Sequence, residues 1–198
     1  HGAARVSWPL REFRGINSLI AILGDVRSYP MTKLAAFVVS LVAALGFMAA
    51  PVAAQDGRIL TGMARGIDSD RIQIGDQIIR LFGIDAMERD QTCRAGQRRM
   101  DCWGNAVRLL QTTVDPEATA CREMGQARFG HIYAVCQTGG QDLSELLARS
   151  GWALAFTRQS EDYVAAEAAA KEAKLGVWQG RFKKPWDHRR DQGRPPDN

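Results

Sequence analysis

The sequence has few of the features that mark zinc proteins, membrane proteins or repeat proteins. It contains three histidines and four cysteines, with no Cys-x-x-Cys and no paired-histidine spacing, so nothing in it supports a zinc site. Beyond residue 54 no apolar run has the length of a membrane span. No internal repeat is present. The 198 residues are enough for one domain with a proper core.

The N-terminal part has the order of a secretory signal peptide. A lysine follows Met31 closely, then comes an apolar run, and a Val-Ala-Ala triplet ends at Ala54. This order predicts a signal peptide over residues 31–54 and a periplasmic or secreted mature protein. It fits a buried core helix less well, and a retained N-terminal anchor is the remaining alternative. Residues 1–30 carry no interpretable signal.

Removal of the predicted signal changes what the charge implies. The whole chain has 26 basic and 22 acidic residues. Residues 1–54 hold five of the basic and two of the acidic ones, which leaves 21 against 20. This balance excludes a global basic field for nucleic acid, so any anion binding must be local.

All four cysteines lie in the part that is predicted to be exported. An even number of cysteines in an oxidising compartment favours disulfides over free thiols. Three pairings are possible. The favoured one joins Cys93 to Cys102 across a Gly- and Arg-rich loop, and Cys121 to Cys136 on two neighbouring predicted strands.

From Gly57 the pattern predicts strands first, a helix between strand groups, and then two more helices. Strands are expected at residues 59–63, 71–74, 77–84, 118–122 and 131–137, and helices at 105–114, 142–151 and 160–176. This order predicts an α+β fold, with a small closed barrel of about five strands and helices packed outside it. The C-terminal part is basic and then Pro-rich, so residues 191–198 are predicted to form a disordered tail.

Carboxylates and an arginine gather around the third predicted strand. The stretch that begins at Arg80 reads RLFGIDAME, in which Asp85 and Glu88 follow a buried run, and Asp70 stands in the turn upstream. Calcium prefers oxygen ligands in flexible geometry. Phosphodiester hydrolysis needs positive charge near the non-bridging oxygens and a base that activates water. Each residue alone is typical of a solvated turn or strand end, but together they favour a metal and phosphate site.

The order and spacing of these residues resemble the staphylococcal nuclease, or thermonuclease, family. The resemblance extends from about Gly57 to Arg190, and it includes the GWALA motif at Gly151 and the GVW motif at Gly176. It implies a five-stranded OB-fold β-barrel with about three packed α-helices over residues 55–190. It also implies Ca²⁺ as cofactor, single-stranded DNA or RNA as substrate, and a monomer.

The resemblance assigns a role to each site residue. Asp70 and Asp85 correspond to the calcium-binding aspartates, and Ala86 to a residue that binds calcium through its backbone carbonyl. Arg80 corresponds to the first arginine that clamps the phosphate. Glu88 corresponds to the carboxylate that activates the attacking water.

The chain departs from the family pattern beside the metal ligands and at the second arginine. Arg71 follows Asp70 directly, and we expect it to point away from Asp70 if the strand alternates there. The Tyr-Gly-Arg motif reads Phe-Gly-His, which puts His131 in the place of the second arginine. Histidine is shorter, not bidentate, and mostly neutral near pH 7. Arg128 is the nearby residue that could substitute.

Two functions therefore remain. The first is an exported Ca²⁺-dependent nuclease with activity reduced at His131. The alternative is a catalytically impaired module on the same fold that binds nucleic acid or a protein. The basic cluster after Trp178 is expected to be a solvated tail. Trp152, Trp178 and Trp186 are expected to be packing residues rather than base-stacking platforms.

Overall fold

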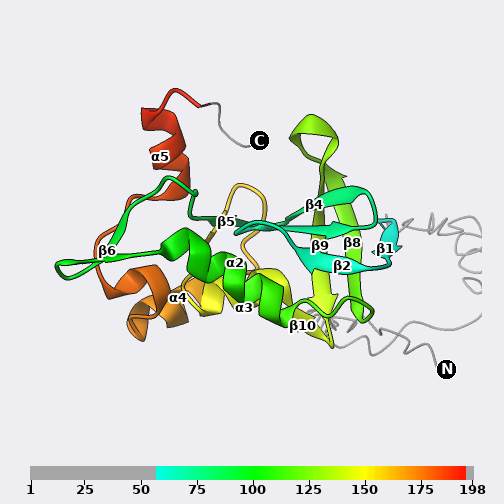
Figure 1. Cartoon of the computed structure of the whole chain (residues 1–198), viewed down its shortest axis with the longest axis horizontal. Coiled ribbons are helices and arrows are strands. Elements are labelled where there is room, and N and C mark those ends of the chain that lie inside the picture. The colour runs from blue at the N-terminus through cyan, green and yellow to red at the C-terminus, as the bar shows by residue number, and fades with distance from the viewer. Residues whose placement is uncertain (1–56, 195–198) are drawn as a thin grey trace, which may run out of the picture. The chain divides into compact units, whose positions relative to one another are not determined.

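The structure is a computed structural model that describes residues 57–194 (Figure 1). The predicted signal peptide at 31–54 and the end of the predicted tail at 195–198 lie outside the described residues. No helix that the structure describes has the length and apolar character needed to cross a membrane.

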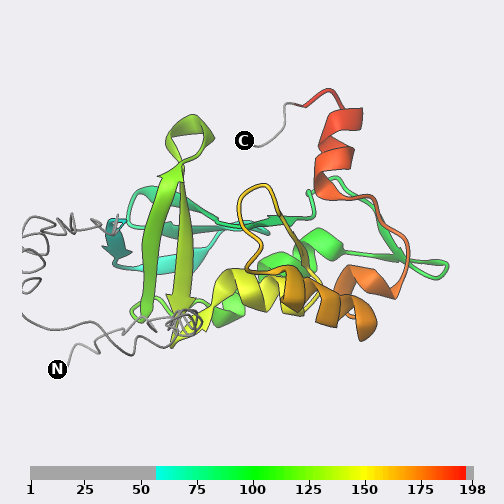
Figure 2. The same ribbon diagram turned by 180° about the vertical axis from the view of Figure 1, so that it is seen from behind.

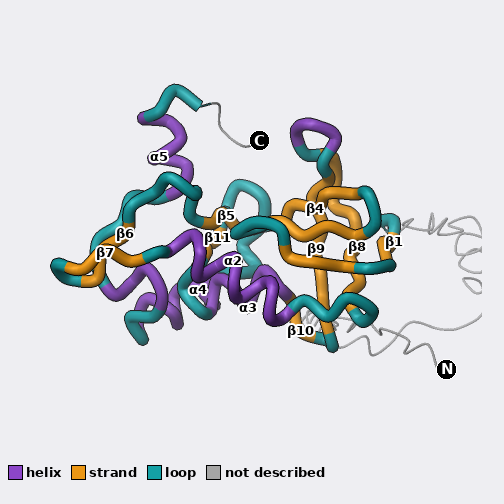
Figure 3. The backbone as a smooth tube through the Cα atoms, viewed as in Figure 1, coloured by secondary structure: helices purple, strands orange, loops and turns teal. Residues whose placement is uncertain are grey.

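A seven-stranded mixed sheet forms the larger β-structure (Figure 3). Its strands are β1 (Ile59–Thr61), β2 (Ala64–Gly66), β3 (Arg71–Ile74), β4 (Gln77–Leu81), β8 (Thr119–Gln126), β9 (Ile132–Thr138) and β10 (Gln141–Asp142). The strand order is β1-β8-β9-β4-β3-β2, with β10 beside β9. Strands β4 and β9 are parallel, whereas β8 and β9 form an antiparallel hairpin. In that hairpin Cys121 is the register partner of Cys136, and the two form a disulfide.

Two short ladders lie beside the large sheet. Strand β5 (Ile84–Ala86) pairs with β11 (Ala153–Ala155), and β6 (Cys93–Ala95) pairs with β7 (Arg98–Met100). The second disulfide, Cys93–Cys102, closes the β6–β7 hairpin against the start of the next helix. Figures 1 and 2 show this hairpin extending away from the large sheet. The favoured disulfide pairing is thus confirmed.

Four α-helices and two short 3-10 turns complete the described chain. They are α2 (Cys102–Thr113), η1 (Arg128–Gly130), α3 (Leu143–Arg149), α4 (Val164–Glu172), η2 (Gly176–Gln179) and α5 (Pro185–Asp191). Asp101 caps α2 by accepting from the Gly104 N–H, and Asp142 caps α3 by accepting from two backbone N–H groups. Helices α2, α3 and α4 lie together on one side of the large sheet (Figure 2).

The core has two parts. The larger part joins the sheet to α2 and α3, and its fully buried side chains include Ile72, Ile79, Leu81, Leu110 and Leu147. The smaller part lies beneath the β6–β7 hairpin and contains Met87, both cysteines of the hairpin disulfide, Leu154 and Val177. Trp152, Trp178 and Trp186 pack against the smaller part, which confirms the prediction that they are packing residues.

The α+β class is confirmed, but the predicted counts of five strands and about three helices are wrong. Two predicted strands are each broken at a glycine. The chain turns at Gly62, where φ is 142°, and at Gly83, where φ is 77°. A Cβ on Gly83 would lie 2.5 Å from the Tyr163 ring, so only glycine fits there. The predicted Gly- and Arg-rich loop forms the β6–β7 hairpin, and the basic tail contributes α5. Among the described residues, β1 and β2 are the two end strands of the large sheet and do not pair with each other.

Candidate active site

Arg80 joins the two predicted calcium ligands. It lies near the end of β4, and its Nε and Nη2 are each 3.0 Å from Oδ2 of Asp70. Its Nη2 is also 3.4 Å from Oδ1 of Asp85. The turn at Gly83 reverses the chain between β4 and β5, which brings Asp85 back to Arg80. Both aspartates are almost completely buried, at 4% and 2% exposure, so their charges require a cation close by.

Arg71 does not point away from Asp70. Its Nε is 3.6 Å from Oδ1 of Asp70, and its Nη1 is 3.5 Å from Oδ2 of Asp68. The reason is that β3 begins at Arg71, so Asp70 still belongs to the preceding turn and strand alternation does not separate the two side chains. Asp70 therefore faces two arginines in the structure.

Arg189 of α5 is the site residue that sequence reasoning missed. Its Nη1 and Nη2 are 3.0 and 2.5 Å from the two carboxylate oxygens of Asp85, and Nη1 is also 2.5 Å from Oε1 of Glu88. Such a bidentate pair is the strongest arginine–carboxylate geometry. The sequence held one signal for it, because a helix that starts at Pro185 places Arg189 one turn later on the same face. Both residues are buried.

Residues on both sides of Arg189 also contact the segment that contains Glu88 and Asp90. Arg194 Nη1 is 3.2 Å from Oε2 of Glu88, and Arg194 Nη2 is 2.8 Å from Oδ2 of Asp90. Gln192 and His188 also contact Asp90. The hydrogen bonds from Gln192 and Arg194 hold the pKa of Asp90 well below its usual range. Both oxygens of Glu88 thus face arginines of the C-terminal segment.

The electrostatics of Asp85 are dominated by its burial. Burial raises the pKa of Asp85 to about 6, and the Arg189 and Arg80 guanidiniums oppose that rise. The nearby Asp70 carboxylate adds to it. At neutral pH the ionised Asp85 therefore depends on the cations around it.

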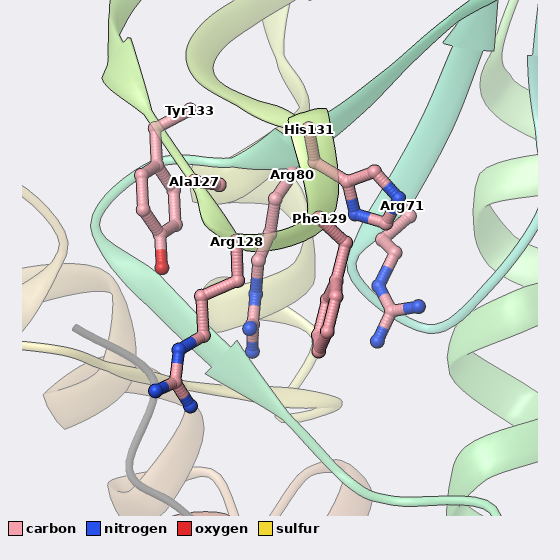
Figure 4. Close-up of a pocket in the computed structure, with 7 residues that line it drawn as sticks. All are labelled: Arg71, Arg80, Ala127, Arg128, Phe129, His131 and Tyr133. Atoms are coloured by element: carbon pink, nitrogen blue, oxygen red, sulfur yellow. The ribbon is translucent and has the colours of Figure 1, made fainter.

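His131 lies in a cationic hollow next to Arg80 (Figure 4). The hollow is lined by Arg71, Arg80, Ala127, Arg128, Phe129, His131 and Tyr133. Burial, with the charges of Arg71 and Arg80, lowers the pKa of His131 below its ordinary value, so the ring is neutral at pH 7. In Figure 4 the Arg128 side chain extends in the same direction as that of Arg80, whereas the His131 ring lies on the side of Arg71.

A second hollow shares Arg80 and Tyr133 with the first. It is lined by Arg80, Ile84, Asp85, Tyr133, Phe156 and Gln159. The structure thus brings Arg80, Asp70, Asp85 and Glu88 into one cluster of ionic contacts, and it places His131 in the adjoining hollow rather than in that cluster.

The cluster contains oxygen donors of the type that a hard cation prefers. Two buried carboxylates face the same cation, Arg80, and Ca²⁺ is bound by such oxygens together with backbone carbonyls. Ala86, the predicted carbonyl ligand, is buried in β5 next to Asp85. Within residues 57–194 no three His, Cys, Asp or Glu side chains gather as a metal-binding group. In this arrangement Arg189 donates hydrogen bonds to both carboxylate oxygens of Asp85.

Comparisons with known proteins show the family of the chain. The family model described as "Staphylococcal nuclease homologue" matches residues 78–180, which include Arg80, Asp85 and Glu88 but neither Asp70 nor Arg189. The chain is also similar to the succinoglycan biosynthesis protein ExoI of Rhizobium meliloti (strain 1021), at 28% identity over 124 residues. That similarity covers 60% of this chain and 64% of ExoI, so the chain spans a little less than two thirds of that relative. The family match covers more than half of the chain, and the chain belongs to the family of staphylococcal nuclease homologues.

Proposed function

We propose that the protein is an exported, Ca²⁺-dependent nuclease that hydrolyses phosphodiester bonds of single-stranded DNA or RNA. The observation that carries this proposal is the ionic cluster in which Arg80 contacts both Asp70 and Asp85, with Glu88 next to them. Family membership and the cationic hollow beside Arg80 support it. The two disulfides among the described residues support export.

Each residue of the cluster has a distinct part in the proposed reaction. Asp70, Asp85 and the Ala86 carbonyl would hold the calcium ion, which supplies positive charge at a non-bridging phosphate oxygen. Arg80 donates hydrogen bonds to the same phosphate and stabilises the charge that grows on it. Glu88 accepts a proton from the attacking water. Since Arg189 contacts Glu88 and both oxygens of Asp85, this reaction requires Arg189 to move aside.

The proposed enzyme has His131 in the place of the second arginine that clamps the phosphate. His131 is neutral at pH 7, so it contributes a hydrogen bond but no charge. Arg128 lines the same hollow and carries a guanidinium. We propose that the nuclease is slow at neutral pH unless Arg128 supplies that charge.

A second candidate is a catalytically impaired module that binds nucleic acid. The position of Arg189 favours it, because the chain's own arginines contact Asp85 and both oxygens of Glu88. A binding module needs neither a calcium ion nor a base. In that case Arg189 would remain in place when nucleic acid binds.

Calcium titration of two variants separates the candidates. Asp85→Asn should weaken calcium binding, because a neutral amide replaces an ionic ligand. Glu88→Gln should keep calcium affinity and lower turnover. Glu145→Gln is a matched control, since Glu145 is exposed and pairs only with Arg149 on α3 in the part of the chain that is described. If the unmutated protein binds no calcium in a calorimeter, the enzyme proposal fails and the binding module remains.

A further inference from the structure

The β6–β7 hairpin carries a row of arginines that the proposed reaction does not use. Arg99 of β7 is the register partner of Arg94 in β6, and Arg94 forms a bridge with Arg181 on its other side. Three arginines therefore lie directly opposite one another on three adjacent chain segments. We call them the arginine row.

The backbone geometry holds the row in close register. Arg94 and Arg181 exchange two backbone hydrogen bonds of 2.9 Å, so both polar groups of Arg94 point toward Arg181. Its pair with Arg99 is then of the non-hydrogen-bonded type, in which Cα atoms are about 4.5 Å apart, against about 5.5 Å for the other pair. The row thus spans about 10 Å. The disulfide Cys93–Cys102 fixes the hairpin at its base.

All three side chains of the row face solvent. Arg94, Arg99 and Arg181 are exposed, whereas their chain neighbours Cys93, Met100 and Phe182 belong to the smaller core or pack against it. One face of the hairpin therefore places Cys93 and Met100 at the smaller core, and the other face carries Arg94 and Arg99. A solvated face explains single arginines, but it does not explain three in one cross-strand row.

The row is not balanced by acidic side chains. Arg94 donates to the Gln97 carbonyl at 3.4 Å, and within residues 57–194 no member of the row forms an ion pair. Like charges directly opposite each other destabilise a strand pair. Such an arrangement becomes favourable when an anion with several charges lies across it.

We propose that the arginine row binds the phosphate backbone of a single-stranded nucleic acid, as a surface separate from the cluster around Arg80. Guanidinium groups match phosphate oxygens in a bidentate geometry. A row of about 10 Å spans about three nucleotides of a stacked strand, in which the rise along the axis is about 3.4 Å for each nucleotide. The choice of nucleic acid over another polyanion rests on the proposed function.

The position of the row predicts that binding depends on the length of the strand. Arg94 follows Glu88 by six positions in the sequence, so the Cα atoms of these two residues lie within about 20 Å of each other. A strand of about six nucleotides spans that distance. Oligonucleotides longer than this should therefore reach both surfaces, and a dinucleotide should reach only one.

Binding of oligothymidylates to the full chain tests the proposal, with both disulfides formed and with chelator present to stop cleavage. The row variant combines Arg94→Gln, Arg99→Gln and Arg181→Gln. The control is Arg149→Gln, an exposed arginine on α3. Fluorescence anisotropy is recorded for a 20-mer and a dinucleotide over a range of salt concentrations. Thermal unfolding checks the fold, and the row variant should melt no lower than the parent because it loses like-charge repulsion.

The row variant should bind the 20-mer about tenfold or more weakly than the parent does. Its slope of log K against log salt should fall by about 2, at about 0.7 for each phosphate that the row no longer neutralises. Dinucleotide binding and the control should match the parent. An unchanged slope and affinity for the 20-mer would overturn the proposal. A loss of affinity for heparin alone, titrated in the same way, would also overturn it and would identify an acidic polysaccharide as the partner. If the row effect appears in a protein that never cleaves DNA, the proposed nuclease fails while this surface stands.

Discussion

Replacement of Arg189 with alanine tests whether this arginine holds the carboxylates of the candidate site in place. The change removes the guanidinium that contacts both oxygens of Asp85 and one oxygen of Glu88. Arg190→Ala is the matched control, because Arg190 is the next residue of the same helix and its side chain is 72% exposed. The two variants lose the same charge from the same helix and differ in burial.

The ion pairs set the size of the expected effect. Removal of one partner of a buried ion pair costs about 3–5 kcal/mol. Asp85 keeps Arg80 at 3.4 Å and Glu88 keeps Arg194 at 3.2 Å, so the lower end applies, at about 3 kcal/mol. In a domain of this size that is a fall of ~10 °C in Tm. Arg190→Ala should stay within about 0.5 kcal/mol of the parent.

Unfolding in chelator and then in calcium completes the test of Arg189. The guanidinium and a calcium ion would compete for the oxygens of Asp85, so Arg189→Ala should bind calcium more tightly than the parent. At 100 times its Kd the ion would restore about 2.7 kcal/mol. Equal Tm values for the two variants in chelator would refute the structural reasoning. Weaker calcium binding in Arg189→Ala would show that Arg189 supports the site instead of competing for it.

The remaining predictions concern His131, Arg128 and the disulfides. Turnover of single-stranded DNA by His131→Arg should rise by ~10²–10³, with calcium affinity unchanged. If His131→Arg cleaves at the parent rate and Arg128→Ala loses most of its turnover, Arg128 is the second arginine that clamps the phosphate. The folded pKa of His131 lies below the unfolded value of 6.5, so the unfolded chain takes up this proton first and the contribution of His131 lowers stability as pH drops below 6.5. Urea unfolding at pH 7.5 and 5.5 should show a smaller difference in His131→Asn, and an equal difference would contradict the assignment. Reduction should cost about 2–4 kcal/mol for each bridge, and unchanged urea unfolding with reductant would contradict that expectation.

Local chemistry is what made much of the fold predictable. The Gly75-Asp76 turn joins β3 to β4, where Gly75 has a φ of 55°, and Asp142 caps α3. Two cysteines on neighbouring predicted strands proved to be register partners. The spacing from Arg80 to Glu88 predicted a cluster of charges, and the structure gathers those side chains. In each case the signal lies within a few residues or in the periodicity of one element.

Two of the three features that the sequence did not predict depend on distant parts of the chain. The break between β4 and β5 at Gly83 is fixed by the Tyr163 ring. Arg189 reaches Asp85 across 104 positions in the sequence, and no local pattern encodes that contact. Arg71 contacts Asp70 because the strand begins one residue later than alternation would require. Tertiary packing decides the first two, and the first residue of β3 decides the third.

Digestion of single-stranded DNA by the purified protein, with calcium and then with chelator, is the most direct test of the central claim. Glu88→Gln is the matched variant, because it keeps the proposed metal ligands Asp70 and Asp85 and removes only the proposed base. The account predicts cleavage by the parent in calcium, loss of cleavage in chelator, and little cleavage by Glu88→Gln in either condition. Cleavage by Glu88→Gln at the parent rate, or no cleavage by the parent in calcium, would contradict the proposed role of this cluster.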